Sequence, residues 1–264
     1  RWYHQAGTPE LDVTGQYDVA EKKYTLSVKQ SSSIESSKPF YIPLLLALID
    51  DKGREVAGTA SLLNVTETEQ QFVFDNIATP VVPSLLRNFS APVKLTHDLS
   101  DIDLAFLIAN DTDEFNRWNT SQQLAVNIML QLIDDCQKNK PLHLDDDFIS
   151  AFKSVLINEN LDKALMARVL TLPSEDYLAE LMSVVDVDAI HQVREFCRRE
   201  IASQLENDLL RVFNSNYSDQ FDLSADSIGQ RSLKNVCLSY PFELNKAETR
   251  KLALVTFESA STLS

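Results

Sequence analysis

Residues 186–214 read DVDAIHQVREFCRREIASQLENDLLRVFN, and apolar side chains recur along them every three or four positions. The recurring positions are Ile190, Val193, Cys197, Ile201, Leu205, Leu209 and Val212. Because an α-helix turns once in about 3.6 residues, this spacing places all of them on one face. The stretch therefore predicts one long amphipathic helix with an apolar face to bury.

The same helical period continues through most of the chain after about residue 100. A helix is predicted over residues 113–138, where Asp111 or Asp113 can cap the first turn. Further helices are predicted at residues 147–158, 162–170, 174–184, 223–238 and 247–259. The chain has only 5 glycines and the links between these segments are short, so an all-α array is the expected architecture. No fixed-period repeat identifies a named solenoid.

Before residue 98 the hydrophobic period is that of strands. Tyr24, Leu26 and Val28 alternate with polar neighbours, which is typical of a half-buried strand. Residues 42–49 form a continuous apolar run that ends at a turn sequence, as an inner strand entering a hairpin does. The alternation returns at residues 70–75 and predicts another strand.

Three prolines between residues 80 and 92 divide the next part of the chain into short extended pieces around residues 89–95. Several short strands at this spacing indicate a small β-sandwich. We therefore predict an α+β multidomain fold, in which a β-sandwich at residues 1–98 is followed by an all-α helical array at residues 99–264.

Charge and cysteine usage narrow the possible partners and the compartment. Lys and Arg number 24 against 39 Asp and Glu, and the formal net charge of -15 repels a nucleic-acid backbone. The longest apolar run, residues 42–49, is far too short to cross a bilayer, so no membrane partner is expected. Three widely spaced cysteines, Cys136, Cys197 and Cys237, argue against a disulfide framework and favour the reducing cytoplasm.

The beginning of the chain supports the same compartment. Residues 1–5 have neither the charged start and apolar core of a signal peptide nor an initiator Met, so we expect a piece of a longer cytoplasmic chain. Asn-x-Ser/Thr triplets, which would accept glycans only in a secretory pathway, occur at Asn64, Asn88, Asn110, Asn119 and Asn216.

Sequence motifs that carry catalysis are missing from the chain. There is no Gly-x-Gly-x-x-Gly, no phosphate-binding loop before a Lys and no Gly-x-Ser-x-Gly. The sequence therefore supports neither a nucleotide-binding fold nor a serine hydrolase. The histidines are too far apart for a His-Glu-x-x-His zinc motif; they are His4, His97, His143 and His191. We therefore assign no catalytic, cofactor-binding or metal-binding residue to this chain.

Two sets of residues on the long helix leave alternatives open. His191 and Glu195 lie four residues apart and could give a metal two ligands, although a solvated pair on the polar face is the simpler interpretation. Basic residues on the same helix could form a docking strip for an acidic segment of another domain. Alternatively, they could lie on a solvent-exposed face and form ion pairs with Glu195 and Glu200. These basic residues are Arg194, Arg198, Arg199 and Arg211.

Two acidic clusters admit a functional and a structural interpretation. The run at residues 145–147 has oxygen donors that suit calcium or magnesium, but a calcium loop needs a Gly that is missing here. Helix capping and the helix dipole explain that run better. His97 and Asp98, beside Asp101 and Asp103, are expected to form a polar interdomain linker and not an acid–base site.

Four segments carry a resemblance to a known family, and they occur in the family's order. They read WYHQAGTP at residues 2–9, LLRNFSAPV at 85–93, DEFNRW at 113–118 and LPSE at 172–175. These strings resemble the bacterial branch of the aminopeptidase N family of zinc metallopeptidases. The likeness fades after Leu238, and the chain is expected to end within the family's helical domain.

The resemblance implies a function that composition alone does not. This chain resembles the family's β-sandwich and the first part of its helical domain, which follow a catalytic domain. The family's zinc ligands, general base and substrate-amine motif belong to that catalytic domain, and no position here matches them. The resemblance thus implies a non-catalytic segment that bridges the domains and covers the active site of an enzyme that removes N-terminal residues from peptides.

Its implied partners are the catalytic domain of the same polypeptide and, in the intact enzyme, peptide substrates, with zinc as the cofactor of the catalytic domain. An expectation follows that part of the helical surface is apolar and exposed in the isolated chain. Two other hypotheses stay open: an independent helical adaptor, and a hydrolase whose metal site is assembled in space around His191 and Glu195.

Overall fold

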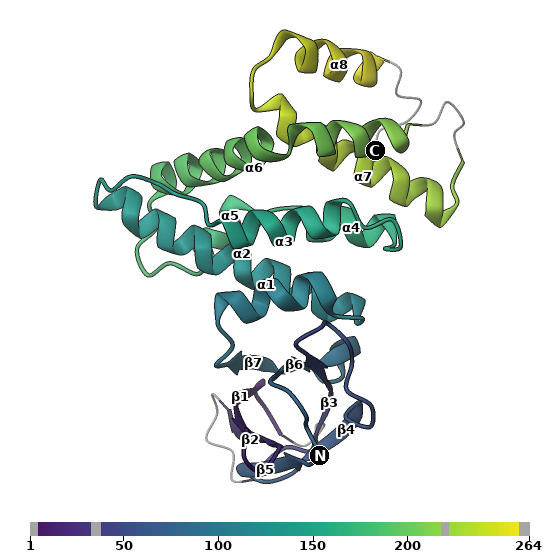
Figure 1. Ribbon diagram of the computed structural model, residues 1–264. Coiled ribbons are helices and arrows are strands. Elements are labelled where there is room, and N and C mark those ends of the chain that lie inside the picture. Colours follow the sequence, from purple (N-terminus) through teal and green to yellow (C-terminus); the bar gives the residue numbers. More distant parts are fainter. Residues whose placement is uncertain (1–4, 33–37, 218–221, 259–264) are drawn as a thin grey trace. The chain divides into compact units, whose positions relative to one another are not determined.

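The computed structural model of the protein describes residues 5–32, 38–217 and 222–258. The chain forms two compact units, residues 1–120 and 121–264, whose elements follow one another along the chain in Figure 1. The predicted domain boundary between residues 98 and 99 stays a prediction. Of the segments singled out above, Trp2, Tyr3 and His4 lie outside the described residues, as does Ser259 at the end of the last expected helix.

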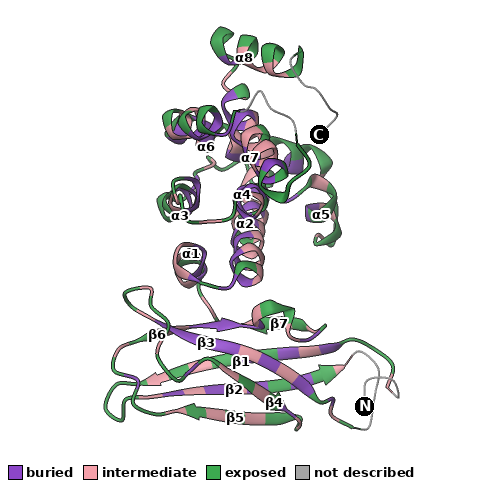
Figure 2. Cartoon of the chain, turned by 90° about the vertical axis from the view of Figure 1, so that its right-hand side faces the viewer, coloured by how far each residue is buried: buried purple, intermediate pink, exposed green. Residues whose placement is uncertain are grey.

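The first unit contains two β-sheets that enclose one apolar core, which confirms the β-sandwich (Figure 2). One sheet has the strand order β5-β2-β1-β7, with β1 antiparallel to β2 and parallel to β7. The other has the order β4-β3-β6. The strands are β1 (Pro9–Asp18), β2 (Lys23–Ser32), β3 (Ile42–Asp50), β4 (Ser61–Val65), β5 (Glu69–Phe74), β6 (Val81–Leu85) and β7 (Lys94–His97).

The predicted alternation and the apolar run both have the expected positions. Tyr24, Leu26 and Val28 of β2 are buried in the core, whereas their neighbours are partly exposed. The run at residues 42–49 is β3, the central strand of its sheet, where both faces are covered for most of its length. β4 and β6 flank it at its two edges, and its alternate residues Ile42, Leu44, Leu46 and Leu48 face the apolar core of the sandwich.

Two strands were not expected from the sequence. In β1 the alternation is interrupted by Gly15, which lies opposite Leu26, so the apolar face of the strand is discontinuous. In β6, Pro83 removes a backbone donor, and the strand is tolerated because it is the edge strand of the sheet, paired only with β3.

The expected polar linker after His97 is wrong, because helix α1 (Asp101–Asn110) begins almost at once. Ser100 and Asp103 form a reciprocal capping box: the backbone N–H of Asp103 donates to Ser100 Oγ at 3.2 Å, and the backbone N–H of Ser100 donates to Asp103 Oδ2 at 2.9 Å. The helix buries Leu104 and Leu107 in the first unit. Asp101 and Asp103 therefore start a helix, and the dipole of that helix favours their charge.

A buried polar cluster joins β6 to the segment between α1 and α2 (Glu114–Gln137). The carboxylate of Asp111 is fully buried and accepts hydrogen bonds from Ser84 Oγ at 2.7 Å and from Asn116 Nδ2 at 2.5 Å. The guanidinium of Arg117 donates to the backbone carbonyl of Asp111. Asp113 caps α2 by accepting from the backbone N–H of Asn116 at 2.8 Å, so the expected cap is confirmed.

The turn after β6 is held by the same cluster. Leu86, Asn88 and Phe89 all have positive φ, between 48° and 58°, a conformation that is costly for residues with a side chain. The backbone N–H of Asn88 donates to Asp113 Oδ2 at 3.0 Å, and Arg87 pairs with Glu55 at 2.9 Å. These bonds offset part of the strain of the turn.

The second unit is an array of helices that packs around α6, as the long periodic stretch predicts (Figure 1). The residues of its predicted apolar stripe are all buried, and α6 packs against α3, α5 and α7. Besides most of α2, the described helices are α3 (Asp146–Leu156), α4 (Lys163–Val169), α5 (Glu175–Glu180), α6 (Val187–Ser215), α7 (Ala225–Phe242) and α8 (Ala247–Glu258).

Two helix ends differ from the prediction. Helix α5 ends at Glu180 and not at residue 184. Val184 and Val185 are β-branched, which lowers their helix propensity, and because both are exposed no burial in the core offsets this. Helix α7 continues to Phe242 through Pro241, although residue 238 was expected to end it. Tyr240 explains the extension, because its ring is buried and its hydroxyl donates to the carbonyl of Leu170 at 2.5 Å.

We expect Gly229→Ala to destabilise the protein by about 1 kcal/mol in urea unfolding. An added Cβ would lie 3.0 Å from the backbone nitrogen of Ala164, where α7 packs against α4. At a solvent-exposed position inside a helix, Gly→Ala would stabilise the protein by up to about 1 kcal/mol. Ser232→Ala, one turn along the same helix, is the control and should change stability little. A gain in stability for Gly229→Ala would show that α4 can move away at no cost.

We expect Asp111→Ala to cost about 3 kcal/mol, because the buried donors of Ser84 and Asn116 and the backbone N–H of Asp113 would lose their acceptor. Ser84→Ala removes two bonds of the cluster, to Asp111 and from Asn116, and leaves the Asp111 carboxylate in place. It should cost about 1–2 kcal/mol, and it tests the cluster if Asp111→Ala does not fold. Asp51→Ala, in an exposed turn, should stay within about 0.5 kcal/mol of the unmodified chain. Equal effects of Asp51→Ala and Asp111→Ala would contradict the assigned role.

Candidate functional site

His191, which sequence analysis considered together with Glu195 for metal binding, makes its hydrogen bond to a residue of another helix. His191 Nδ1 lies 3.0 Å from Glu175 Oε1 of α5, and its side chain is 63% exposed. The hydrogen bond to Glu175, then its charge, raises the pKa of His191 above the usual 6.5. Among the described residues no group of three or more His, Cys, Asp or Glu side chains could hold a metal ion. These residues therefore do not fit a zinc site.

The basic residues of α6 are partly used inside the helical unit. Arg194 Nε donates to the carbonyl of Pro173 at 3.0 Å, and Arg198 pairs with Glu243 at 2.7 Å beyond the end of α7. Arg198 also donates to the carbonyl of Ser239 at 3.0 Å. The prediction that these two arginines lie on a solvent-exposed face is therefore wrong, because they join α6 to neighbouring segments.

The acidic clusters have structural roles in the described chain. Asp145 is the N-cap of α3 and accepts from the backbone N–H of Asp147 at 2.7 Å, which confirms the capping interpretation. Asp98 Oδ2 accepts from the backbone N–H of Gly15 at 3.1 Å, and so ties the end of β7 to β1. His97 Nδ1 accepts from the backbone N–H of Leu99 at 3.3 Å.

The cysteines are free thiols, and two of them are in the core of the helical unit. Cys197 of α6 and Cys237 of α7 are buried, and burial raises the pKa of each thiol to about 12. Cys136, near the end of α2, is only partly buried. Low reactivity of the buried pair follows, because the thiolate is the reactive form.

One feature of the surface agrees with the expectation of an exposed apolar region. Tyr177, Leu181, Val184, Val185 and Val187 are all exposed, with Val184 at 78% and Val187 at 67%. They lie on α5, on the link after it and at the first residue of α6, and we name them the α5–α6 face. Exposed apolar side chains that form one contiguous patch are typical of an interaction surface.

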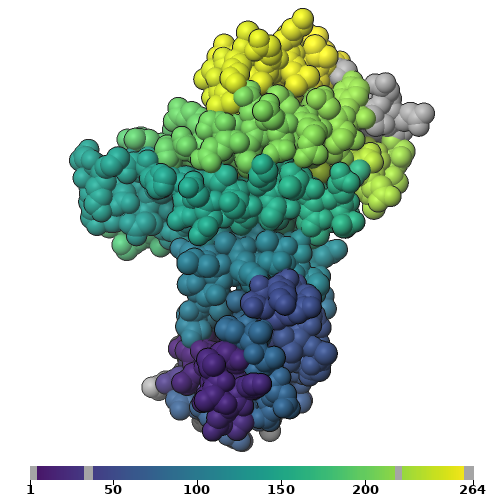
Figure 3. All heavy atoms as spheres, viewed as in Figure 1, coloured from purple at the N-terminus to yellow at the C-terminus, as the bar shows by residue number. Residues whose placement is uncertain are grey.

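Helix α8 also exposes apolar side chains. It lies on the outside of the helical unit, where it contacts α7, and Figure 3 shows its atoms as an outer layer. Leu254, Val255 and Phe257 are exposed, and Thr249 is its buried residue among those that the structure describes. This helix therefore contributes little to the core.

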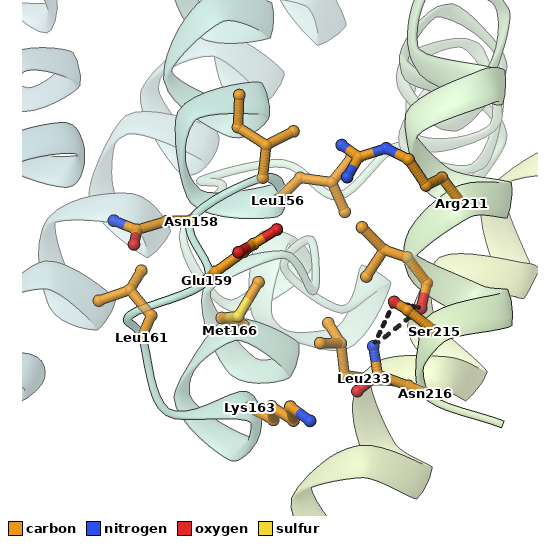
Figure 4. A pocket seen from close by; sticks show the side chains of 12 residues that line it. Leu156, Asn158, Glu159, Leu161, Lys163, Met166, Arg211, Ser215, Asn216 and Leu233 are labelled. Carbon is orange, nitrogen blue, oxygen red and sulfur yellow. Dashed lines mark hydrogen bonds between the residues drawn. The ribbon is translucent and has the colours of Figure 1, made fainter. Parts of the chain in front are cut away.

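A pocket of about 270 Å³ lies among α3, α4, α6 and α7 (Figure 4). Its floor consists of buried residues, most of them apolar: Leu156, Met166, Val212, Asn216 and Leu233. Its rim carries charged and polar side chains, including Glu159, Lys163, Arg211 and Ser215. Sequence analysis did not identify this pocket, because its lining comes from separate segments that only packing brings together.

Two units define the class of protein: a β-sandwich and an array of helices that follows it. The family described as a domain of unknown function (DUF3458_C) with ARM repeats matches residues 101–264, and the chain belongs to this family. A second family, described as a domain of unknown function (DUF3458) with an Ig-like fold, matches residues 7–98. The ARM-repeat description names a solenoid class that the sequence, with no fixed period, did not reveal.

The particular relatives are aminopeptidases. Aminopeptidase N of Escherichia coli (strain K12) is 37% identical over 250 residues, which are 91% of this chain and 29% of the relative. Aminopeptidase N of Haemophilus influenzae is 33% identical over the same shares of the two chains. The crystal structure of Legionella pneumophila aminopeptidase A in complex with aspartic acid is similar at a TM-score of 0.83 and 31% identity, over 98% of this chain and 30% of that one.

The chain thus spans less than a third of the length of these relatives. The resemblance to the aminopeptidase N family is confirmed, and the chain is homologous to non-catalytic domains of aminopeptidase N. Among the described residues no helix is long and apolar enough to cross a membrane.

We expect Glu175→Gln to lower the pKa of His191, measured by NMR titration of the imidazole protons. The pKa of His191 is raised in the folded chain, so the stabilising pair is complete below about pH 6.5 and is lost as the pH rises through the folded value. The stability difference between the unmodified chain and Glu175→Gln should therefore be larger at pH 5.5 than at pH 8.5. Glu180→Gln, on the same helix, should leave the titration of His191 unchanged.

Proposed function

We propose that this chain is a non-catalytic segment of a zinc aminopeptidase, which bridges domains and covers the active site of the intact enzyme. The intact enzyme would remove N-terminal amino acids from peptides. The similarity to aminopeptidase N along 91% of the chain carries this proposal, because so long a match includes both units. The match covers only 29% of the relative, so a catalytic domain can lie elsewhere in the same polypeptide.

The physical role of such a segment is confinement and positioning. A cover over an active site excludes bulk water and large substrates, and it keeps a short peptide oriented while the chemistry takes place elsewhere. The exposed α5–α6 face supports this role, since burying Val184 and Val187 against another domain would contribute about 1.5 kcal/mol or more per side chain.

We assign no catalytic, cofactor-binding or metal-binding residue to this chain. Zinc would belong to the catalytic domain of the intact protein, where it would activate water for peptide hydrolysis. The partners proposed for the chain are that catalytic domain and, in the intact enzyme, peptide substrates. We further propose a location in the cytoplasm and no role in binding nucleic acid or membranes, in line with the net charge of -15.

The purified chain should release no chromophore from an alanyl anilide, with zinc added, and should contain no stoichiometric zinc. The reason is that the chemistry is proposed to reside in another domain. Turnover that a chelator abolishes would overturn the proposal and favour a metal site assembled within this chain.

A chimera tests the covering role directly. Replacing the matched region of Escherichia coli aminopeptidase N by this chain should give a folded, active enzyme, because the two are 37% identical. The pair Val184→Asp and Val187→Asp should lower the activity of the chimera at least about tenfold by placing charge in the proposed contact. Val19→Asp is the control, since Val19 is equally exposed at 73% but lies in the sandwich. Equal activity of all variants would show that the α5–α6 face covers nothing.

A further inference from the structure

The α5–α6 face lies in a stretch of the chain that has no basic residue. Residues 169–193 contain neither Lys nor Arg, and they form α5, the link after it and the first turns of α6. The carboxylates of this stretch are Glu175, Asp176, Glu180, Asp186 and Asp188. The exposed apolar side chains of the face are therefore accompanied by negative charge.

The two helices of this stretch are held together at one corner of the helical unit. His191 Nδ1 lies 3.0 Å from Glu175 Oε1, so the first turn of α5 is beside the second turn of α6. Tyr177 and Leu181 are one helical turn apart and share one face of α5, and Val187 is one turn before His191 on α6. Helix α5 and the link after it are largely exposed (Figure 2).

Three carboxylates of this corner have no cation beside them. Asp176, Glu180 and Asp188 are exposed, and none of them forms an ion pair with a described residue. Glu175 differs, because His191 is its partner. Positive charge for the other three has to come from outside the described chain.

The basic groups of neighbouring elements have partners of their own. Arg194 of α6 donates to a backbone carbonyl at 3.0 Å. Gln137 of α2 donates to Asp186 at 3.0 Å, so the end of α2 lies beside the face. The two lysines that follow, Lys138 and Lys140, pair with other carboxylates at 2.6 and 2.7 Å. These cations therefore do not neutralise the face.

The position of Glu180 is not explained by the helix that carries it. Asp176 and Asp188 lie in the first turns of α5 and α6, where the helix dipole favours a negative charge. Glu180 is the last residue of α5, where the dipole disfavours one. A cation supplied by a partner would offset this unfavourable interaction.

We propose that the α5–α6 face binds a partner surface that is apolar at its centre and carries Lys or Arg side chains around it. A second copy of this chain is a poor partner, because two such faces would bring like charges together. The inference rests on the proposed function, in which the partner is the catalytic domain of the same polypeptide, and it adds the chemistry of that domain's contact surface.

Two probes with the same apolar tail and opposite charge test the face in the full 264-residue chain. Decylammonium and decanoate are titrated below their critical micelle concentrations and followed by amide NMR shifts. Decylammonium is expected to shift residues 177–188 at a concentration at least about tenfold lower than decanoate does, because only its charge complements the face. An equal response to both probes, or a preference for decanoate, would overturn the proposal.

Helix α8 is the internal control for the net charge of the chain. It exposes Leu254 and Val255 one turn from Arg250 and Lys251, so it offers apolar side chains beside basic ones. Its amide resonances should not show the preference for decylammonium. The same preference at α8 would show that the overall charge of the chain, and not the face, selects the probe.

A charge reversal locates the preference at the face. Glu180→Lys should reduce it at least about threefold, because it replaces an unpaired carboxylate by a cation. Asp51→Lys makes the same change in an exposed turn of the sandwich and should leave the preference unaltered. An unaltered preference in Glu180→Lys would contradict the assigned role of this carboxylate.

The chimera with Escherichia coli aminopeptidase N distinguishes a basic partner from a contact that is only apolar. The rate at which a thiol reagent modifies Val184→Cys is measured by mass spectrometry of the labelled peptide. Modification should be at least about tenfold slower in the chimera than in the isolated chain, because a contact excludes the reagent. This protection should fall at least about threefold between 0.1 M and 1 M NaCl, since the screening length shortens from about 10 Å to about 3 Å.

The outcomes separate the two proposals. Protection that salt leaves unchanged would overturn the basic partner and leave the covering role intact. Equal modification in the chimera and the isolated chain would overturn both.

Discussion

The buried carboxylate of Asp111 is the constraint on which the first unit depends. A fully buried charge is tolerated only where donors surround it, and Ser84, Asn116 and the more distant Arg87 supply them. These partners come from β6, from the turn after it and from the first turn of α2. The start of α2 is therefore held to the edge of a β-sheet by polar contacts, whose geometry is more specific than that of apolar packing.

Hydrophobic periodicity made most of the fold predictable, and the elements that it did not predict have physical reasons. The stripe of α6 and the alternation of β2 are local patterns, and both are buried as predicted. Helix α1 was missed because its first turn reads as acidic, although the pair Ser100 and Asp103 is a capping signal. The cluster around Asp111 could not be predicted, since Ser84 and Asp111 are distant in sequence and only the packing of the unit brings them together.

The candidate sites were less predictable than the fold. A helical spacing of four suggested His191 with Glu195, yet the partner of His191 is Glu175, on another helix. Arg198 likewise bonds to Glu243 and not to its neighbours on α6. In the sequence, Asn216 was notable only as part of a glycosylation triplet. The structure shows it buried at the end of α6, where it lines the pocket. Partners from other elements depend on tertiary packing, which helical spacing does not contain.

The two buried thiols give the helical unit an internal reporter of its own opening. Cys197 and Cys237 belong to the packed pair α6 and α7, and every cysteine of the chain lies after residue 120. A thiol reagent can reach them only when these helices separate, so the rate of modification measures the free energy of that separation. The sandwich contributes no signal. Labelling kinetics can therefore distinguish loss of the helical array from loss of the sandwich within one unmodified chain.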